Sequence, residues 1–204
     1  MNILNVISSP RGDQSFSIKL ADGIIEKLQE ANPGVTVTTR DLATNPFPHL
    51  EAAKLQSLFT PAPDRTPEQQ EAAKHSDDAI SEVQAADVIV IGAPLYNFGI
   101  PSVLKAWIDH ICRAGITFKY VDGAPQGLVT GKKVYVAMAS GGIYSEGPAA
   151  GYDFVAPYLK AVLGFIGITD VTVVRVEGVS IPSEQATALE KALGSVSVAD
   201  EVVA

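Results

Sequence analysis

The stretch that decides the fold is DVIVIGAPLYNFGIPSVLKAWID, residues 87–109. Its apolar, β-branched beginning, Asp87–Gly92, predicts a strand that is buried on both faces of a parallel sheet. Pro94 lacks a donor for a sheet ladder and Gly99 frees the backbone, so we expect the strand to give way to a loop here. Pro101 then suits the first position of a helix. Ligands of open α/β sheets bind beyond the carboxyl ends of the strands, which makes this loop a candidate binding site.

The composition is that of a soluble globular protein. The 204 residues are 47% hydrophobic and 19% charged, and the chain is long enough for one large core. We therefore predict a single domain over residues 1–204. A formal net charge of −8 argues against a nucleic-acid groove and against an anionic membrane surface as partner.

The cysteine content and the absence of targeting segments indicate a cytoplasmic protein. The single Cys112 excludes an internal disulfide and favours a reducing compartment. Residues 1–8 lack the basic region of a signal peptide. No apolar run approaches the roughly 18 residues that a membrane span requires.

Apolar periodicity and turn residues divide the chain into alternating strands and helices. Strands are predicted at residues 3–7, 35–41, 87–92, 133–139 and 171–176. Helices are predicted at about 15–32, 51–59, 67–86, 101–111, 153–166 and 182–193, with a small hairpin within 115–131. Right-handed crossovers then favour an α/β fold, the doubly wound five-stranded parallel sheet of flavodoxin type with helices on both faces. The proline-rich excursion Leu42–Pro67 is expected to be a lid or a partner surface.

Three loops should meet at the carboxyl edge of this sheet: Ser8–Ser17, Pro94–Ile100 and Ser140–Gly151. The first loop is rich in hydroxyl groups and leads into a helix N-terminus, which attracts anions such as phosphate. Its serines are equally compatible with ordinary turns and helix caps. It matches neither a P-loop nor G-x-G-x-x-G, so sites for nucleoside triphosphates and classical dinucleotide sites are disfavoured.

The other two loops suit a planar ring. Tyr96 and Phe98 offer flat apolar surface beside the amide of Asn97, although they would serve equally well to cap the sheet or to face a partner chain. Gly141 and Gly142 allow a backbone to approach a ligand closely, but a glycine pair alone is weak evidence.

Six separated motifs give the chain a family resemblance. They are the loop Ser9–Ser17, APLYNFGIPS from Ala93, AGITFKY from Ala114, GLVTGKK from Gly127, SGG at Ser140 and LGFIGITD from Leu163. Together and in this order they resemble the FMN-dependent NADH azoreductases, which belong with the NAD(P)H:quinone reductases of flavodoxin-like fold. The resemblance covers nearly the whole chain.

The resemblance implies a single FMN-binding domain and an enzyme that works by ping-pong. NADH or NADPH would reduce the flavin, and a quinone or an azo compound would then take the electrons, with two such cycles for full cleavage of an azo bond to amines. Hydride transfer through FMN needs no acid or base residue. The residues implied for FMN are Ser9, Ser15, Phe16 and Ser17 at the phosphate, Leu95, Tyr96, Asn97 and Phe98 at the ring, and Ser140, Gly141 and Gly142 at its other edge.

The resemblance also implies a homodimer with the active site at the interface. Phe118 and Tyr120 would reach the flavin of the other subunit, and Val162 stands where some relatives have a pocket aromatic, which would widen the substrate pocket. Independently, Tyr158–Ile168 is apolar around more than one helical face. Such a helix is either part of an interface or buried on both sides.

Three other functions are less consistent with the sequence. Asp109, His110 and Cys112 suggest a cysteine nucleophile, but on a helix His110 points about 100° away from Asp109, so we expect a core thiol and a surface histidine. No spacing of His, Cys and acidic residues predicts a metal. The alternative function is a flavodoxin-type electron carrier, which shares the fold and the acidic charge but should not oxidise NADH. The Leu42–Pro67 excursion and the apolar helix disfavour it.

Overall fold

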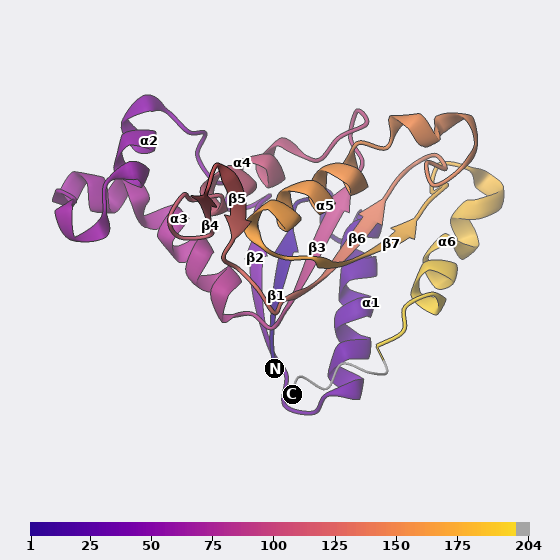
Figure 1. Cartoon of the computed structure of the whole chain (residues 1–204). Helices are drawn as coiled ribbons and strands as arrows, with labels where there is room; N and C mark the ends of the chain where they lie inside the picture. Colours follow the sequence, from indigo (N-terminus) through magenta and orange to yellow (C-terminus); the bar gives the residue numbers. More distant parts are fainter. Residues whose placement is uncertain (199–204) are drawn as a thin grey trace.

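The computed structural model describes residues 1–198 and contains a five-stranded parallel sheet with helices on both faces (Figure 1). The strand order is β2-β1-β3-β6-β7, which confirms the predicted flavodoxin-like topology. Residues 199–204, which the predicted domain includes, lie outside the described residues. The strands of this sheet are β1 (Asn2–Ile7), β2 (Thr36–Asp41), β3 (Val88–Pro94), β6 (Lys133–Ala139) and β7 (Asp170–Val176).

Helices cover the two faces of the sheet in separate groups. Alternate residues of a strand point to opposite faces, so Leu4 packs with the helices of one face and Ile3 with those of the other. The first face carries α3 (Pro67–Ala85), α4 (Ser102–Ile111) and α5 (Val155–Ile166). The second carries α1 (Phe16–Ala31) and α6 (Pro182–Gly194). None of the helices within residues 1–198 is both long enough and apolar enough to cross a membrane.

The central strand β3 continues to Pro94, so the prediction that it would end before this proline is wrong. In a parallel strand, alternate residues bond to opposite neighbours. Leu95 donates its N–H to the carbonyl oxygen of Ala139 in β6 at 2.8 Å, and the nitrogen of Pro94 therefore faces β1. On that side the ladder has already ended at the pair Ile7 and Gly92. The missing donor of Pro94 therefore removes no hydrogen bond from the ladder between β1 and β3.

A small hairpin, β4 (Phe118–Val121) and β5 (Ala124–Gly127), confirms the predicted one. Its turn residues Asp122 and Gly123 have positive φ angles of 52° and 81°, as the tight hairpin turn requires. Gly127 allows the hairpin to sit directly on the end of α5. A Cβ atom on Gly127 would lie only 2.1 Å from the backbone nitrogen of Gly167.

The excursion after β2 begins with an irregular segment, residues 42–51, and continues with α2 (Ala52–Phe59) and the short helix η2 (Ala62–Asp64). Its buried anchor is Phe47, whose ring makes edge contacts with His75 and His110. His110 is itself fully buried, and its Nε2 lies 2.9 Å from the carbonyl oxygen of Pro48. The prediction that His110 is a surface residue is therefore wrong, because the excursion folds back over that side of α4.

Burial lowers the pKa of His110 from its ordinary value of 6.5. The hydrogen bond to Pro48 opposes this shift, while His75 and Lys54 add to it and Asp109 counteracts it. The native protein thus binds fewer protons at His110 than the unfolded chain does just below pH 6.5. Its contribution to stability is complete above about pH 6.5 and is lost as the pH falls toward the lowered value.

We expect this loss to depend on the His110 side chain. Urea unfolding between pH 8 and pH 5.5 should show a free energy of unfolding that falls more steeply in the wild type than in His110→Gln, which has no titrating group. His49→Gln, a change at an exposed histidine of the same excursion, should leave the wild-type profile intact. Parallel profiles for wild type and His110→Gln would show that the buried imidazole does not titrate as described.

Candidate functional site: a cavity at the carboxyl edge of the sheet

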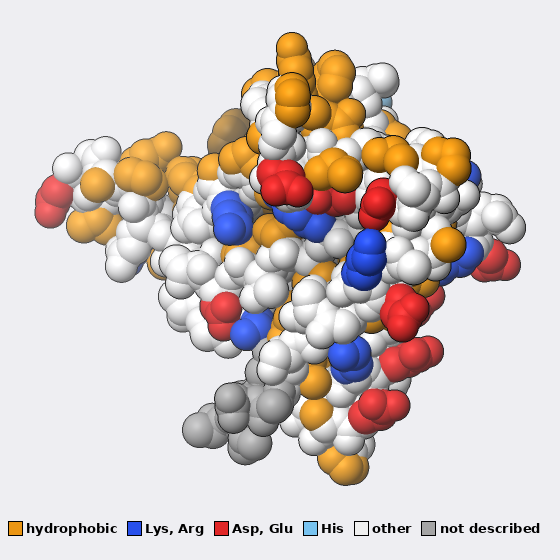
Figure 2. Space-filling view, turned by 90° about the vertical axis from the view of Figure 1, so that its right-hand side faces the viewer, with side chains coloured by type: hydrophobic (Ala, Val, Ile, Leu, Met, Phe, Trp, Pro, Cys, Tyr) orange, Lys and Arg blue, Asp and Glu red, His pale blue; other side chains and the backbone are white. Residues whose placement is uncertain are grey.

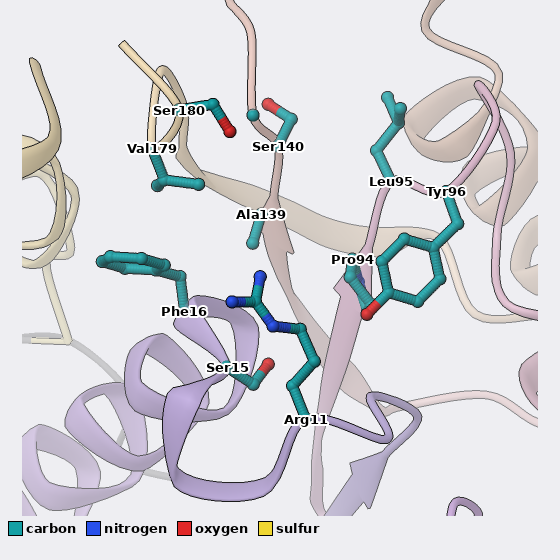
Figure 3. A pocket seen from close by; sticks show the side chains of 11 residues that line it. Arg11, Ser15, Phe16, Pro94, Leu95, Tyr96, Ala139, Ser140, Val179 and Ser180 are labelled. Atoms are coloured by element: carbon teal, nitrogen blue, oxygen red, sulfur yellow. The ribbon is translucent and has the colours of Figure 1, made fainter. Parts of the chain in front are cut away.

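The three predicted loops meet at one cavity of about 220 Å³ at the carboxyl edge of the sheet. Because β1, β3 and β6 are parallel neighbours, their ends deliver the loops to the same place (Figure 3). The first loop passes through the 3₁₀ turn η1 (Gly12–Gln14) before α1 begins. The lining residues are Arg11, Ser15, Phe16, Pro94, Leu95, Tyr96, Ala139, Ser140, Gly141, Val179 and Ser180.

The first loop brings buried hydroxyl groups to the N-terminus of α1. Ser15 is the N-cap residue, and its Oγ lies 3.5 Å from the backbone nitrogen of Ile18, a long contact, and 3.0 Å from Oγ of Ser17. Both serines are buried, with Ser15 at the cavity wall and Ser17 behind it. The first N–H groups of a helix have no intrahelical acceptor. This end of the cavity therefore offers hydroxyl and amide donors to an anion.

The second loop folds into a tight turn. Tyr96 and Gly99 exchange two backbone hydrogen bonds of 3.0 Å, and the two residues between them have positive φ angles, 48° at Asn97 and 70° at Phe98. Asparagine tolerates this left-handed conformation, but a phenylalanine there is strained. The turn points the Phe98 ring outward, where it is 45% exposed. Strain of this kind is frequent at functional sites.

The first two loops also share a second cavity of about 560 Å³ that adjoins the first at Tyr96. Ser8 and Pro10 line it from one side, and Asn97 lines it from the other. The hydroxyl groups of Ser9 and Tyr96 are 3.5 Å apart and connect the two loops directly. The combined space falls in the range of roughly 300–1,000 Å³ that is typical of small-molecule sites.

The third loop closes the cavity with glycines. Ser140 donates its hydroxyl to the carbonyl oxygen of Gly142 at 2.8 Å, so the Gly-Gly pair curls back on the end of β6. A Cβ atom on Gly141 would lie 2.8 Å from Oγ of Ser180. Glycine at this position lets the loop after β6 approach the loop after β7, and both line the same cavity.

A charged network holds this third loop in place. Arg175 of β7 pairs with Asp153 at 2.5 Å and with Glu177 at 3.6 Å. Asp153 in turn accepts hydrogen bonds from the first N–H groups of α5, which follows the 3₁₀ helix η3 (Gly147–Tyr152). Glu177 accepts from the backbone of Tyr144 at 2.8 Å. One guanidinium thus fixes both the start of α5 and the middle of the loop.

Sequence reasoning did not find four residues at or beside this site. Arg11, Val179 and Ser180 line the cavity, and Tyr152 stacks on Phe98 with ring centroids 5.1 Å apart. The sequence could have indicated Val179 and Ser180 by their position just after β7, because the carboxyl end of this strand lies at the same edge of the sheet as the cavity. Arg11 lies inside the predicted hydroxyl loop.

None of the three residues predicted for the substrate pocket lines the cavity of the same chain, and of the predicted FMN residues the following are also outside its lining: Ser9, Ser17, Asn97, Phe98 and Gly142. Phe118 packs on Phe165 with ring centroids 4.3 Å apart and on Tyr120 at 5.9 Å. Val162 is half-buried on α5 against the core. Phe118 and Tyr120 lie on the hairpin, whose Gly127 packs against Gly167 at the end of α5 that is far from the loops described above.

Cys112 gives no sign of nucleophilic chemistry. Burial raises the pKa of its thiol to about 11, with a smaller contribution from the nearby Asp109. Within residues 1–198 the structure shows no hydrogen bond between His110 and this thiol, and the Nε2 of His110 lies 2.9 Å from the carbonyl oxygen of Pro48 instead. The expected core thiol agrees with this environment.

Comparison with known proteins gives one consistent family. The model of a family described as having a flavodoxin-like fold matches residues 1–198. An FMN-dependent NADH:quinone oxidoreductase of Herminiimonas arsenicoxydans is 53% identical over 96% of this chain and 94% of its own. The enzyme of the same name from Mesorhizobium japonicum is 49% identical over 100% of this chain and 96% of its own.

Solved structures agree. An azoreductase from Bacillus anthracis strain Sterne has a TM-score of 0.87 at 33% identity and covers 95% of each chain. An FMN-dependent NADH-azoreductase from Bacillus anthracis strain Ames Ancestor, in complex with FMN, has a TM-score of 0.84 at 29% identity, again over 95% of each chain. The family resemblance predicted from the sequence is confirmed: this chain belongs to the flavodoxin-like family of FMN-dependent NADH:quinone oxidoreductases and azoreductases.

Proposed function

We propose that this enzyme binds FMN in the cavity at the carboxyl edge and passes two electrons from NADH to quinones and to aromatic azo compounds. The observation that carries the proposal is the distribution of groups around one cavity. Buried hydroxyls at a helix N-terminus form one end, and Leu95 and Tyr96 form the other. A phosphorylated tricyclic cofactor needs hydrogen-bond donors for its phosphate at one end and apolar surface for its ring at the other.

The chain's own groups fit that cofactor. Ser9, Ser15 and Ser17, with the free N–H of Phe16, would bind the phosphate at the start of α1. Leu95, Tyr96, Asn97 and Phe98 would hold the ring, with Ser140, Gly141 and Gly142 along its other edge. Backbone N–H groups near the ring would stabilise negative charge on it.

When bound, FMN would accept a hydride from NADH and afterwards release two electrons to an acceptor, a ping-pong sequence that runs twice for complete azo cleavage. The chain's contribution is to orient donor and acceptor in turn on one face. No acidic or basic side chain lines the cavity other than Arg11, so we assign no acid or base catalyst.

We further propose a cytoplasmic, single-domain homodimer with a shared site. Its support is an exposed apolar surface beside the cavity, where Tyr152 and Phe154 are 54% and 58% exposed and Phe154, Pro157 and Tyr158 line an apolar hollow. Figure 2 shows hydrophobic side chains gathered at the upper edge of the molecule, at the height of η3 in Figure 1. Tyr120, 64% exposed on the hairpin, would complete the partner's site with Phe118 and Val162.

The first test is a visible spectrum of the purified protein followed by NADH oxidation. We expect bound FMN, and faster turnover with a benzoquinone than with an azo dye, since one quinone needs a single reductive cycle. A colourless protein that takes up no FMN would refute the proposal. A protein that binds FMN but does not oxidise NADH would be a carrier of flavodoxin type instead.

The second test separates phosphate binding from helix capping at Ser15. Aspartate and asparagine are both good N-cap residues, so Ser15→Asp and Ser15→Asn should fold with similar stability. Only the aspartate places a negative charge against the phosphate, and we expect it to weaken FMN binding by about 100-fold relative to the asparagine variant. Equal FMN affinity of the two variants, measured by quenching of flavin fluorescence, would place the phosphate elsewhere.

The third test addresses the shared site. Analytical ultracentrifugation should give about twice the 21.4 kDa of one chain. Tyr120→Ala should raise KM for the quinone about tenfold without changing FMN content, because it removes an aromatic contact. Lys119→Ala, on the opposite face of the same strand, is the matched control and should leave KM unchanged. A fully active monomer would contradict the shared site.

A further inference from the structure

Among residues 1–198, Arg11 is the one charged residue that lines the cavity, and its sequence context gave it no role. It lies in the loop between β1 and α1, at the N-cap of η1. Figure 3 shows its side chain rising from this loop into the cavity, with the guanidinium between Phe16 and Pro94 and below Ala139. Ser15 lies beside its stem.

The guanidinium has no carboxylate partner among residues 1–198. The chain has five arginines, and the other four are paired: Arg40 with Glu82, Arg65 and Arg113 with Asp77, and Arg175 with Asp153. Arg11 is an exposed residue of a protein with a net charge of −8, and its guanidinium points into a cavity that no acidic residue of the described chain lines. An unpaired guanidinium of this kind suits an anion that arrives with the ligand.

The position of Arg11 indicates that the anion it would bind is a phosphate. The same cavity wall holds the N-cap Ser15 and the free N–H groups of the first turn of α1. Hydroxyl and amide donors supply hydrogen bonds to a phosphate but only partial charge. Arg11 is the one lining residue that can neutralise a phosphate dianion with a full charge.

We propose that Arg11 is the counter-ion of the FMN phosphate and that it makes this enzyme select phosphorylated flavin over riboflavin. The inference rests on the proposed function, since it concerns the same cavity. Arg11 acts here as a binding residue and takes no part in electron transfer. Its planar fork of donors matches two phosphate oxygens, whereas lysine would supply charge without that geometry.

The test compares FMN and riboflavin affinities of the flavin-stripped full chain by fluorescence quenching. Arg11→Gln should weaken FMN binding by about 10–100-fold and leave riboflavin binding within about threefold, as expected for loss of one charge-assisted contact. Arg11→Lys should recover part of the FMN affinity. Added salt should weaken FMN binding to the wild type more than to Arg11→Gln.

Lys19→Gln is the matched control, because it removes the same charge near the start of α1. Lys19 lies outside the cavity, with its ammonium 5.6 Å from the centre of the Phe16 ring. We expect FMN affinity close to that of the wild type. An equal loss of FMN affinity in Lys19→Gln would mean that any positive charge near the start of α1 has the same electrostatic effect, and it would overturn the proposal.

Two further outcomes would also overturn it. Equal losses of FMN and riboflavin affinity in Arg11→Gln would indicate a structural role for Arg11 in shaping the loop. Unchanged FMN affinity with a raised KM for NADH would assign Arg11 to the phosphates of the donor. A wild-type chain that binds neither flavin would instead refute the proposed function, which is a distinguishable result.

Discussion

The site depends on the parallel arrangement of three buried strands. β1, β3 and β6 are neighbours in one sheet, and their residues pair in register up to the carboxyl edge. Every residue of β3 is buried, so the strand cannot slide without exposing its apolar side chains. The loops that follow these strands therefore start from fixed points. Donors for a phosphate and apolar surface for a ring meet only because the sheet is parallel there.

Rigid strand ends also allow the second loop to keep an unfavourable backbone. Phe98 occupies a left-handed conformation that costs a non-glycine residue on the order of 1–2 kcal/mol. Glycine would remove this cost, but it would also remove the ring that stacks on Tyr152. The free-energy cost is tolerated because the hydrogen bonds between Tyr96 and Gly99 close the turn. The residue with the strained backbone, Phe98, is thus one whose ring makes a specific contact, the stacking on Tyr152.

The sequence predicted the fold and the three loops that line the candidate cavity, because both follow from local patterns. Buried β-branched runs are properties of neighbouring residues, and so are the N-caps that Ser15 and Thr66 form at the starts of α1 and α3. The predictions that were wrong concerned residues whose environment is set by segments far away in the sequence. Pro94 stays in its strand because β1 ends earlier, and His110 is buried because Phe47, 63 positions away, folds over it. Arg11 is exposed, and it received no role from the sequence because no local pattern shows where its guanidinium points.

The shared site that we propose follows from the same architecture. Helix α5 runs back across the sheet from the carboxyl edge, and the N–H of Phe154 just before it donates to the carbonyl oxygen of Phe98 at 3.2 Å. The ring loop and the start of α5 therefore form one continuous surface. That surface exposes several aromatic rings, and their exposure to water is unfavourable. A second copy that covers the exposed side of α5 would also cover the mouth of the cavity, so association would bury these rings and exclude water from the redox site in one step.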